Sequence, residues 1–156
     1  SLPTISGIAS QTGISLLQVS GLTASQLQQV MAALATLHIE TDMLQHHGEW
    51  PSQLTLSLAV ASAELSQVID AVQKLTENSA VSLHHPQQNL AKLSVVGIGI
   101  KSDPLLVSKI FNAFNEMNVQ LYLVAHSESR LSALIAAEQL EKVAARLHQI
   151  LVTVDN

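Results

Sequence analysis

The pattern of hydrophobic and polar positions occurs twice along the chain. In the first half, apolar runs and alternating apolar and polar residues predict four strands, at residues 14–22, 40–47, 54–58 and 80–85. Two helices are predicted between these strands, because aliphatic residues recur at helical spacing after Thr23 and after Ser62. The first half therefore follows the order strand, helix, strand, strand, helix, strand.

The second half repeats this order. Three strands are predicted, at residues 90–99, 121–124 and 130–135, with one helix after the second half's first strand and another after its third. The ferredoxin-like pattern needs a fourth strand, for which residues 151–154 and residues 4–9 are both candidates. We favour a crossover by residues 4–9, because it uses a strand that is otherwise unpaired.

These elements predict an α+β fold class with two ferredoxin-like (βαββαβ) modules. The first module is predicted at residues 14–86, and the second at residues 4–9 plus 90–154. The first helix of each predicted module begins at a recognisable capping sequence. Thr23 and Gln26 have the spacing of a capping box, and Ser102-Asp103-Pro104 combines a polar cap with a proline at the position where a missing N–H costs little.

Composition excludes several classes of function. Hydrophobic residues make up 47% of the chain and charged residues 12%, which indicates a folded protein with an aliphatic core. A net charge of −5 and only 3% aromatic residues argue against a nucleic-acid partner. The absence of cysteine excludes disulfides, thiolate zinc sites and cysteine nucleophiles. No apolar run approaches the roughly 20 residues that span a bilayer, and no signal peptide is recognisable, so we expect no membrane partner and a cytoplasmic location.

Three motifs in the second half fall in order over about residues 90–151. They are a strand that ends in Gly97-Ile98-Gly99-Ile100-Lys101-Ser102 before a helix, a strand pair at residues 124–132, and the helix ending Ala145-Arg146-Leu147-His148. They resemble the last ACT domain of aspartate kinases, in which the corresponding segments read G-x-G-x-K/R-S, S-T-S-E-x-x-[IV]-S and A-x-x-L-H. The spacing of the three motifs also resembles that family.

The first half resembles the same family less closely. Residues 5–9 are similar to the V-T-G-I-A segment that enters the regulatory region of these kinases, and residues 39–45 are similar to its I-N-[IV]-D-M-I-x-Q strand. Two segments depart from the family. The D-[KR]-P-G loop before the first helix is replaced by a shorter turn at residues 21–25, and the N-V-S…T-D-I-[ST]-F run is replaced at residues 46–52. Both departures lie where an effector of the first module would be held.

The resemblance implies the regulatory region of an aspartate kinase, either as an excised fragment or as a separate regulatory subunit. The implied partners are an amino-acid effector, with lysine or threonine first, a second copy of the chain in a homodimer, and the catalytic domain of the kinase. The implied cofactors, ATP and Mg, belong to that catalytic domain, and none is expected in this chain. The parent enzyme would phosphorylate the side-chain carboxylate of aspartate in lysine, threonine and methionine biosynthesis.

The resemblance places one effector site in the second module. The free N–H groups at the start of the helix after Asp103 would receive an effector carboxylate, and strand carbonyls with an acidic side chain would receive its ammonium group. The candidate residues are Lys101, Ser102, Asp103, Pro104, Leu105, Val124, Ala125, Ser127 and Glu128. The alternative interpretation is that Ser102-Asp103-Pro104 only caps a helix.

Transposing the family's other effector site gives a second set of candidates. These are Thr23, Ala24, Ser25, Gln26, Gln45, Asn118, Gln120 and Leu121. We favour a purely structural interpretation for this set, in which Gln26 completes a capping box and residues 118–120 end a helix.

The remaining polar motifs do not predict catalysis or a metal site. The adjacent histidines 46–47 and 84–85 would point to opposite faces of their strands and have no carboxylate at ligand spacing. Glu40 and Asp42 would share a strand face, but nothing around them suggests acid–base chemistry. No phosphate-binding G-x-x-x-x-G-K-[ST] motif is present. Two alternatives to the kinase interpretation remain, a free-standing tandem ACT sensor for another enzyme of amino-acid metabolism and a dimerisation module without an effector.

Overall fold

The computed structural model describes the backbone of residues 4–155 and their side chains, except those of residues 4–6, 98 and 152–155. The chain divides into two compact units. One comprises residues 13–88, and the other joins the segment that ends at Thr12 to the residues from Asn89 onward. The sequence-based module bounds were 14–86 and 4–9 plus 90–154.

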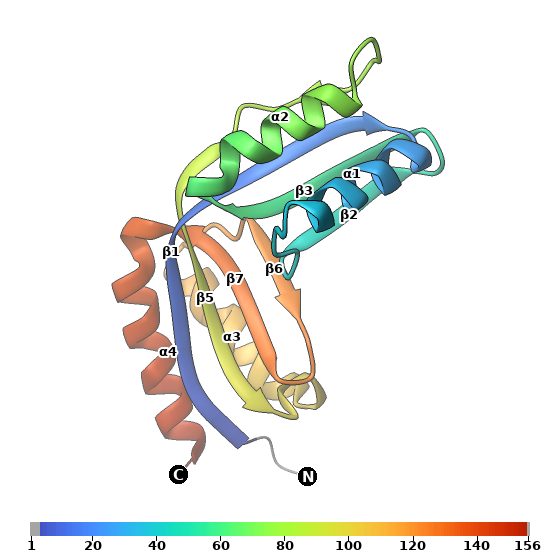
Figure 1. The fold of residues 1–156 in the computed structure, drawn as a ribbon. Coiled ribbons are helices and arrows are strands. Elements are labelled where there is room, and N and C mark those ends of the chain that lie inside the picture. The colour runs from blue at the N-terminus through green and yellow to red at the C-terminus, as the bar shows by residue number, and fades with distance from the viewer. Residues whose placement is uncertain (1–3, 156) are drawn as a thin grey trace. The chain divides into compact units, whose positions relative to one another are not determined.

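The unit at residues 13–88 is a four-stranded sheet with two helices. Its elements are the second part of β1 (Thr4–Leu22), α1 (Ala24–Thr36), β2 (Leu44–Glu49), β3 (Gln53–Ala61), a 3₁₀ turn (Ser62–Glu64), α2 (Leu65–Leu75) and β4 (Ser82–Leu83). The strands lie in the order β4-β1-β3-β2, and the three pairings are antiparallel. This is the ferredoxin-like strand order, in which β2 forms one edge of the sheet (Figure 1).

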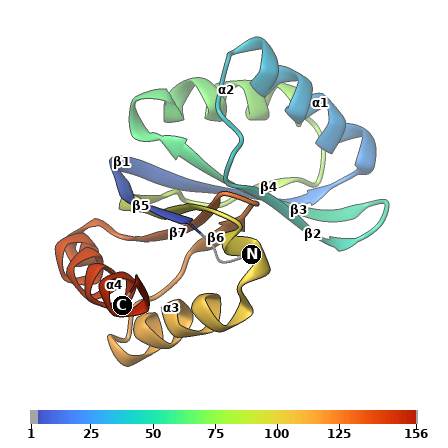
Figure 2. The ribbon, with the colours of Figure 1, turned by 90° about the horizontal axis from the view of Figure 1, so that it is seen from below.

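The second unit repeats this architecture. Its elements are the first part of β1, β5 (Gln87–Ile98), a 3₁₀ turn (Ile100–Ser102), α3 (Pro104–Glu116), β6 (Leu123–His126), β7 (Arg130–Ala136), a 3₁₀ turn (Ala137–Gln139) and α4 (Leu140–Asp155). The strands lie in the order β1-β5-β7-β6, with β6 at one edge. In each unit both helices cover one face of the sheet (Figure 2).

Each unit has its own aliphatic core between helices and sheet. In the unit at 13–88, Leu17 and Val19 of β1 pack with Val68 of α2. In the other unit, Leu93 of β5 packs with Ile110 of α3 and Leu147 of α4. All six side chains are at most 2% exposed, and they come from the apolar positions that predicted these strands and helices.

The N-terminal strand confirms the predicted crossover. Residues 4–12 belong to the second unit, where β1 lies beside β5. The prediction of two separate strands at 4–9 and 14–22 was wrong, because β1 is one strand of 19 residues (Figure 1). The alternative strand at 151–154 was also wrong, since α4 extends to Asp155.

Three other predicted strands differ in their bounds. The strand predicted at 40–47 begins only at Leu44, because His38 takes a positive φ of 58° after α1 and residues 42–43 form a turn. Glu40 and Asp42 therefore lie outside the strand, and the prediction that they share a strand face was wrong. The strand predicted at 121–124 is shifted to Leu123–His126, and the strand predicted at 80–85 is reduced to Ser82–Leu83.

Both predicted helix starts are confirmed. The Thr23 hydroxyl accepts a hydrogen bond from the Gln26 N–H at 3.1 Å, and the Gln26 side-chain oxygen accepts one from the Thr23 N–H at 2.9 Å. This reciprocal pair is the capping box expected from the sequence. None of the described helices combines the length and apolar character that crossing a bilayer requires.

Gly48, near the end of β2, generates a prediction about stability. Gly48 has a φ of +114°, and a Cβ at this position would collide with the backbone oxygen of Gln53. Gly13 in β1 also has a positive φ, +69°, but a Cβ there would meet nothing within 4 Å. We expect Gly13→Ala to lower the free energy of unfolding by about 1 kcal/mol, the cost of left-handed backbone, and Gly48→Ala to lower it by clearly more. Urea unfolding followed by circular dichroism measures both, and equal losses would contradict the steric argument.

Candidate functional site

The structure brings the two halves of the predicted second-module site to one end of a sheet. The N–H of Gly99, after β5, donates to the carbonyl oxygen of Glu128 at 3.1 Å. The N–H of Gly97 donates to the carbonyl oxygen of Ser129 at 2.8 Å. The turn that carries residues 101–105 therefore lies beside the turn between β6 and β7. Motifs more than 20 residues apart in sequence thus form one continuous surface.

The start of α3 is capped by the protein itself. Oδ1 of Asp103 accepts a hydrogen bond from the N–H of Leu106 at 3.1 Å, and Pro104 has no N–H to offer. The N–H groups of Ser102 and Asp103 donate to the carbonyls of Gly99 and Ile100. The predicted cap at Ser102-Asp103-Pro104 is therefore confirmed. A ligand carboxylate would find the Leu105 N–H at this terminus, with the Asp103 carboxylate already occupying part of the positive end of the helix.

The facing strand end carries the remaining residues of this set. Val124 and Ala125 of β6 are partly buried, whereas Ser127 and Glu128 in the following turn are exposed. Ser127 is held in the turn, because its N–H donates to the carbonyl oxygen of Arg130 at 2.8 Å. Glu128 thus presents a carboxylate on a fixed turn, and Lys101 presents an ammonium group on the neighbouring turn. Groups of opposite charge in this arrangement suit a zwitterion.

His126, at the end of β6, has a pKa that is affected by the charge of Lys101 on the neighbouring turn. Although the residue is exposed overall, partial desolvation lowers its pKa below the usual histidine value, and the ammonium group of Lys101 lowers it further. Desolvation is the larger of the two causes. The effect of Lys101 on His126 links the turn after β5 electrostatically to the end of β6. Sequence reasoning had not singled out His126, although its position inside the predicted strand-pair motif was a signal for it.

The second set of candidates is divided between the two units. Thr23, Ala24, Ser25 and Gln26 start α1, and Gln45 lies on β2 of the same unit. Their polar groups are largely engaged, since Thr23 and Gln26 bond each other and the Ala24 N–H donates to the Pro51 carbonyl at 2.7 Å. Asn118, Gln120 and Leu121 belong to the other unit, where they follow α3 and Asn118 has a φ of 53°. The capping box predicted at Thr23 and Gln26 is present, as the structural interpretation expects.

An open cavity that the sequence did not predict lies beside the start of α1. It has a volume of about 310 Å³ and is bordered by α1, β2 and the turn after β2, with the lining residues Ala24, Leu27, Gln28, Met31, Leu44, His46 and Trp50. Trp50 is 68% exposed and is the only tryptophan of the chain. An exposed tryptophan in a turn was the sequence signal for this cavity, because such a large apolar side chain is seldom left in water without a function.

The histidine pairs lie on or beside strands. His46 and His47 are exposed on β2, and Nε2 of His84 is 2.8 Å from the hydroxyl oxygen of Ser20. Within the part of the chain that the structure describes, no three histidine or acidic side chains gather at a metal-binding distance.

The Asp103 cap generates a prediction. We expect Asp103→Ala to lower the free energy of unfolding by about 1 kcal/mol, because the Leu106 N–H loses its partner and the helix start loses a favourable negative charge. Ser102→Ala is the matched control, since Ser102 is exposed and its hydroxyl bonds no described residue. Urea unfolding of both variants tests this, and an unchanged Asp103→Ala protein would show that the cap contributes nothing.

The lowered pKa of His126 generates a second prediction for this site. We expect its pKa, followed by NMR, to lie below that of a free histidine, and Lys101→Met to recover only the smaller part of the shift. Because the neutral ring is favoured in the folded state, the unfolded chain binds the proton more readily. His126 therefore contributes stability that is present above the unfolded pKa and is lost as pH falls through the folded pKa. A His126 pKa above the free value would contradict this assignment.

The sequence is similar to those of known proteins. Residues 93–151 match the ACT domain family. An aspartokinase from Thermus thermophilus is 30% identical over 124 residues, which are 78% of this chain and 30% of that protein. An aspartate kinase from Stutzerimonas stutzeri is 23% identical over 94% of this chain and 36% of its own length. The chain thus spans about a third of the length of these curated relatives.

The fold comparison covers nearly the whole chain. The crystal structure of the regulatory subunit of aspartate kinase from Thermus thermophilus, in its ligand-free form, superposes with a TM-score of 0.84 at 24% identity. The match covers 94% of this chain and 98% of that subunit. Residues 93–151 are therefore similar to the ACT domain family, and the chain as a whole shares the tandem ferredoxin-like ACT fold of that subunit.

Proposed function

We propose that this chain is an amino-acid-sensing regulatory region or subunit of an aspartate kinase. The observation that carries the proposal is the adjacency of residues 101–105 and 124–128 at one end of the sheet, inside the segment that matches the ACT domain. An amino acid is a small zwitterion, and this surface offers one cationic and one anionic side chain together with the Leu105 N–H at the start of α3.

The proposed binding mode follows from the groups that stay available. The effector carboxylate would bind the Leu105 N–H and the Lys101 ammonium group, since Asp103 already holds the Leu106 N–H. The effector ammonium would bind Glu128 and strand-end carbonyls. An effector with different affinities for two states of the kinase would shift the population towards the state that it binds better.

The proposed partners are a kinase catalytic domain and a second copy of the chain. The relatives named aspartokinase are about three times as long as this chain, which leaves room for a catalytic domain that would use ATP and Mg. Each unit has an edge strand, β2 in one and β6 in the other, and edge pairing with a second copy would cover their backbone groups in a homodimer. Such a complex would act in the cytoplasm, in the pathway towards lysine, threonine and methionine.

The second candidate is a dimerisation module without an effector. The observations that favour it are the internal hydrogen bonds at both helix starts, the capping box at Thr23 and the Asp103 cap. These bonds satisfy groups that an effector would otherwise use.

Calorimetry distinguishes the two candidates. We expect the chain to bind at least one of lysine, threonine, methionine and diaminopimelate with a Kd of roughly 1 μM to 1 mM. Glu128→Gln should weaken binding by about tenfold, because a charged partner of the ammonium group is lost. Glu138→Gln is the matched control, since Glu138 is exposed on the 3₁₀ turn after β7, away from these residues.

The outcomes of these titrations distinguish effector sensing from a dimerisation module. Absence of binding by all four amino acids would contradict effector sensing. In that case, a dimer in sedimentation analysis would support the dimerisation module. An unchanged affinity in Glu128→Gln would show that the effector is held elsewhere.

A further inference from the structure

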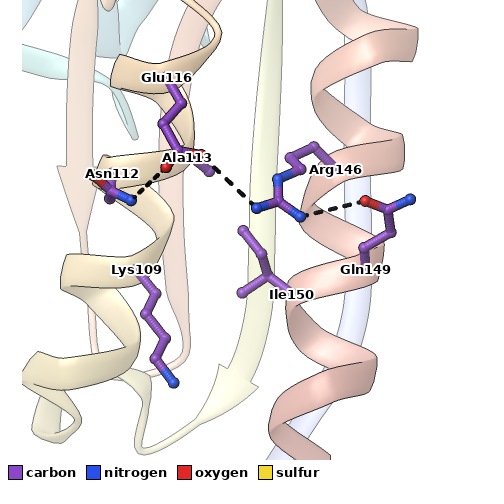
Figure 3. Close-up of a pocket in the computed structure, with 7 residues that line it drawn as sticks. All are labelled: Lys109, Asn112, Ala113, Glu116, Arg146, Gln149 and Ile150. Atoms are coloured by element: carbon purple, nitrogen blue, oxygen red, sulfur yellow. Dashed lines mark hydrogen bonds and ion pairs between the residues drawn. The ribbon is translucent and has the colours of Figure 1, made fainter.

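A groove between α3 and α4 has the character of a second ligand site, independent of the proposed effector surface. Its cavity has a volume of about 270 Å³. Four side chains come from one face of α3, at intervals of three and four residues, and three come from α4, namely Lys109, Asn112, Ala113, Glu116, Arg146, Gln149 and Ile150 (Figure 3). Both helices belong to the same unit.

Apolar side chains form part of the lining. Ala113 is 1% exposed, and its small side chain leaves space between the helices. Ile150 is partly buried and packs against the core of the unit. A ligand that enters the groove would therefore contact hydrocarbon as well as charged groups, and burying its own apolar part would favour binding.

Two of the three charged side chains in the groove, those of Glu116 and Arg146, are paired with each other. Glu116 and Arg146 form an ion pair at 3.8 Å across the groove, and Glu116 also accepts a hydrogen bond from Asn112 at 3.1 Å (Figure 3). Arg146 donates in addition to the side-chain oxygen of Gln149 at 3.3 Å. The carboxylate of Glu116 is thus neutralised by its neighbours.

Lys109 has no such partner. Among the described residues, none forms a hydrogen bond or an ion pair with its ammonium group. The groove therefore carries one net positive charge, in a chain whose net charge is −5 and which has only seven lysine and arginine residues. Two of those seven line this cavity. Lys109 is the group to which an anion would bind.

We propose that this groove binds a small organic monocarboxylate with a short hydrocarbon chain. The carboxylate pairs with Lys109, and the hydrocarbon lies against Ile150, in the space that the small side chain of Ala113 leaves. One net positive charge matches a monoanion better than the double negative charge of a phosphate. The volume accepts a molecule of a few carbon atoms.

The test uses pentanoate as the probe and the full chain, uniformly labelled with ¹⁵N for NMR. We expect saturable shifts of the amides at residues 109–116 and 146–150, with a Kd on the order of millimolar. Pentanol, pentylamine and inorganic phosphate should each bind at least about tenfold more weakly, since each lacks either the single negative charge or the hydrocarbon. Affinity should rise by about threefold for each methylene from acetate to pentanoate.

Substitutions test whether the ammonium group of Lys109 is the charge that binds pentanoate. Lys109→Met should weaken pentanoate binding by about tenfold or more, whereas Lys109→Arg should retain it within about threefold. Lys142→Met is the matched control, because Lys142 is exposed on α4 and does not line the cavity. Glu116→Gln should tighten binding by about threefold, because it releases Arg146 from its ion pair.

Three results would overturn the proposal. The first is the absence of saturable shifts up to about 50 mM pentanoate, beyond the weak range expected for so small a ligand. The second is equal binding of pentanol or phosphate. The third is an unchanged affinity in Lys109→Met. None of these results depends on whether an amino acid binds at residues 101–128.

Discussion

The hydrogen bonding of β1 is the constraint on which the rest of the structure depends. This strand supplies residues 4–12 to one unit and residues 13–22 to the other. Without residues 4–12, the sheet of β5, β7 and β6 would leave the backbone of β5 unpaired on one side. The strand therefore completes a ferredoxin-like order in a unit whose other elements all lie after residue 86.

Completion of that sheet positions the candidate effector surface. β5 is held between β1 and β7, so its end is fixed where the chain turns towards α3. The bonds from Gly97 and Gly99 then join this turn to the one between β6 and β7. The turns that carry Lys101 and Glu128 are therefore neighbours because the backbone hydrogen bonds of the sheet bring them together.

The same unit offers two surfaces of different chemistry. At the strand ends, backbone groups and side chains of both signs are available on exposed turns. In the groove between α3 and α4, an internally neutralised carboxylate leaves one free ammonium group above an apolar floor. The first suits a zwitterion, and the second suits a monoanion with a hydrocarbon part. Sequence reasoning found the first surface through its motifs. It missed the second, because a groove between two helices depends on how they pack.

The sequence by itself determined the fold class and both helix starts, because local hydrophobic period and capping chemistry act over a few residues. It favoured the crossover strand only through the ferredoxin-like pattern, which needs a fourth strand that residues 4–9 could supply. The tertiary structure decided that residues 4–22 form one strand and that β2 begins at Leu44, since both depend on which distant backbone groups pair. It also decided that Asp103 uses its carboxylate on α3 and that Glu116 pairs with Arg146 across a groove that Lys109 also lines. These features depend on distances between side chains and backbone groups that the spacing of residues in a sequence does not define.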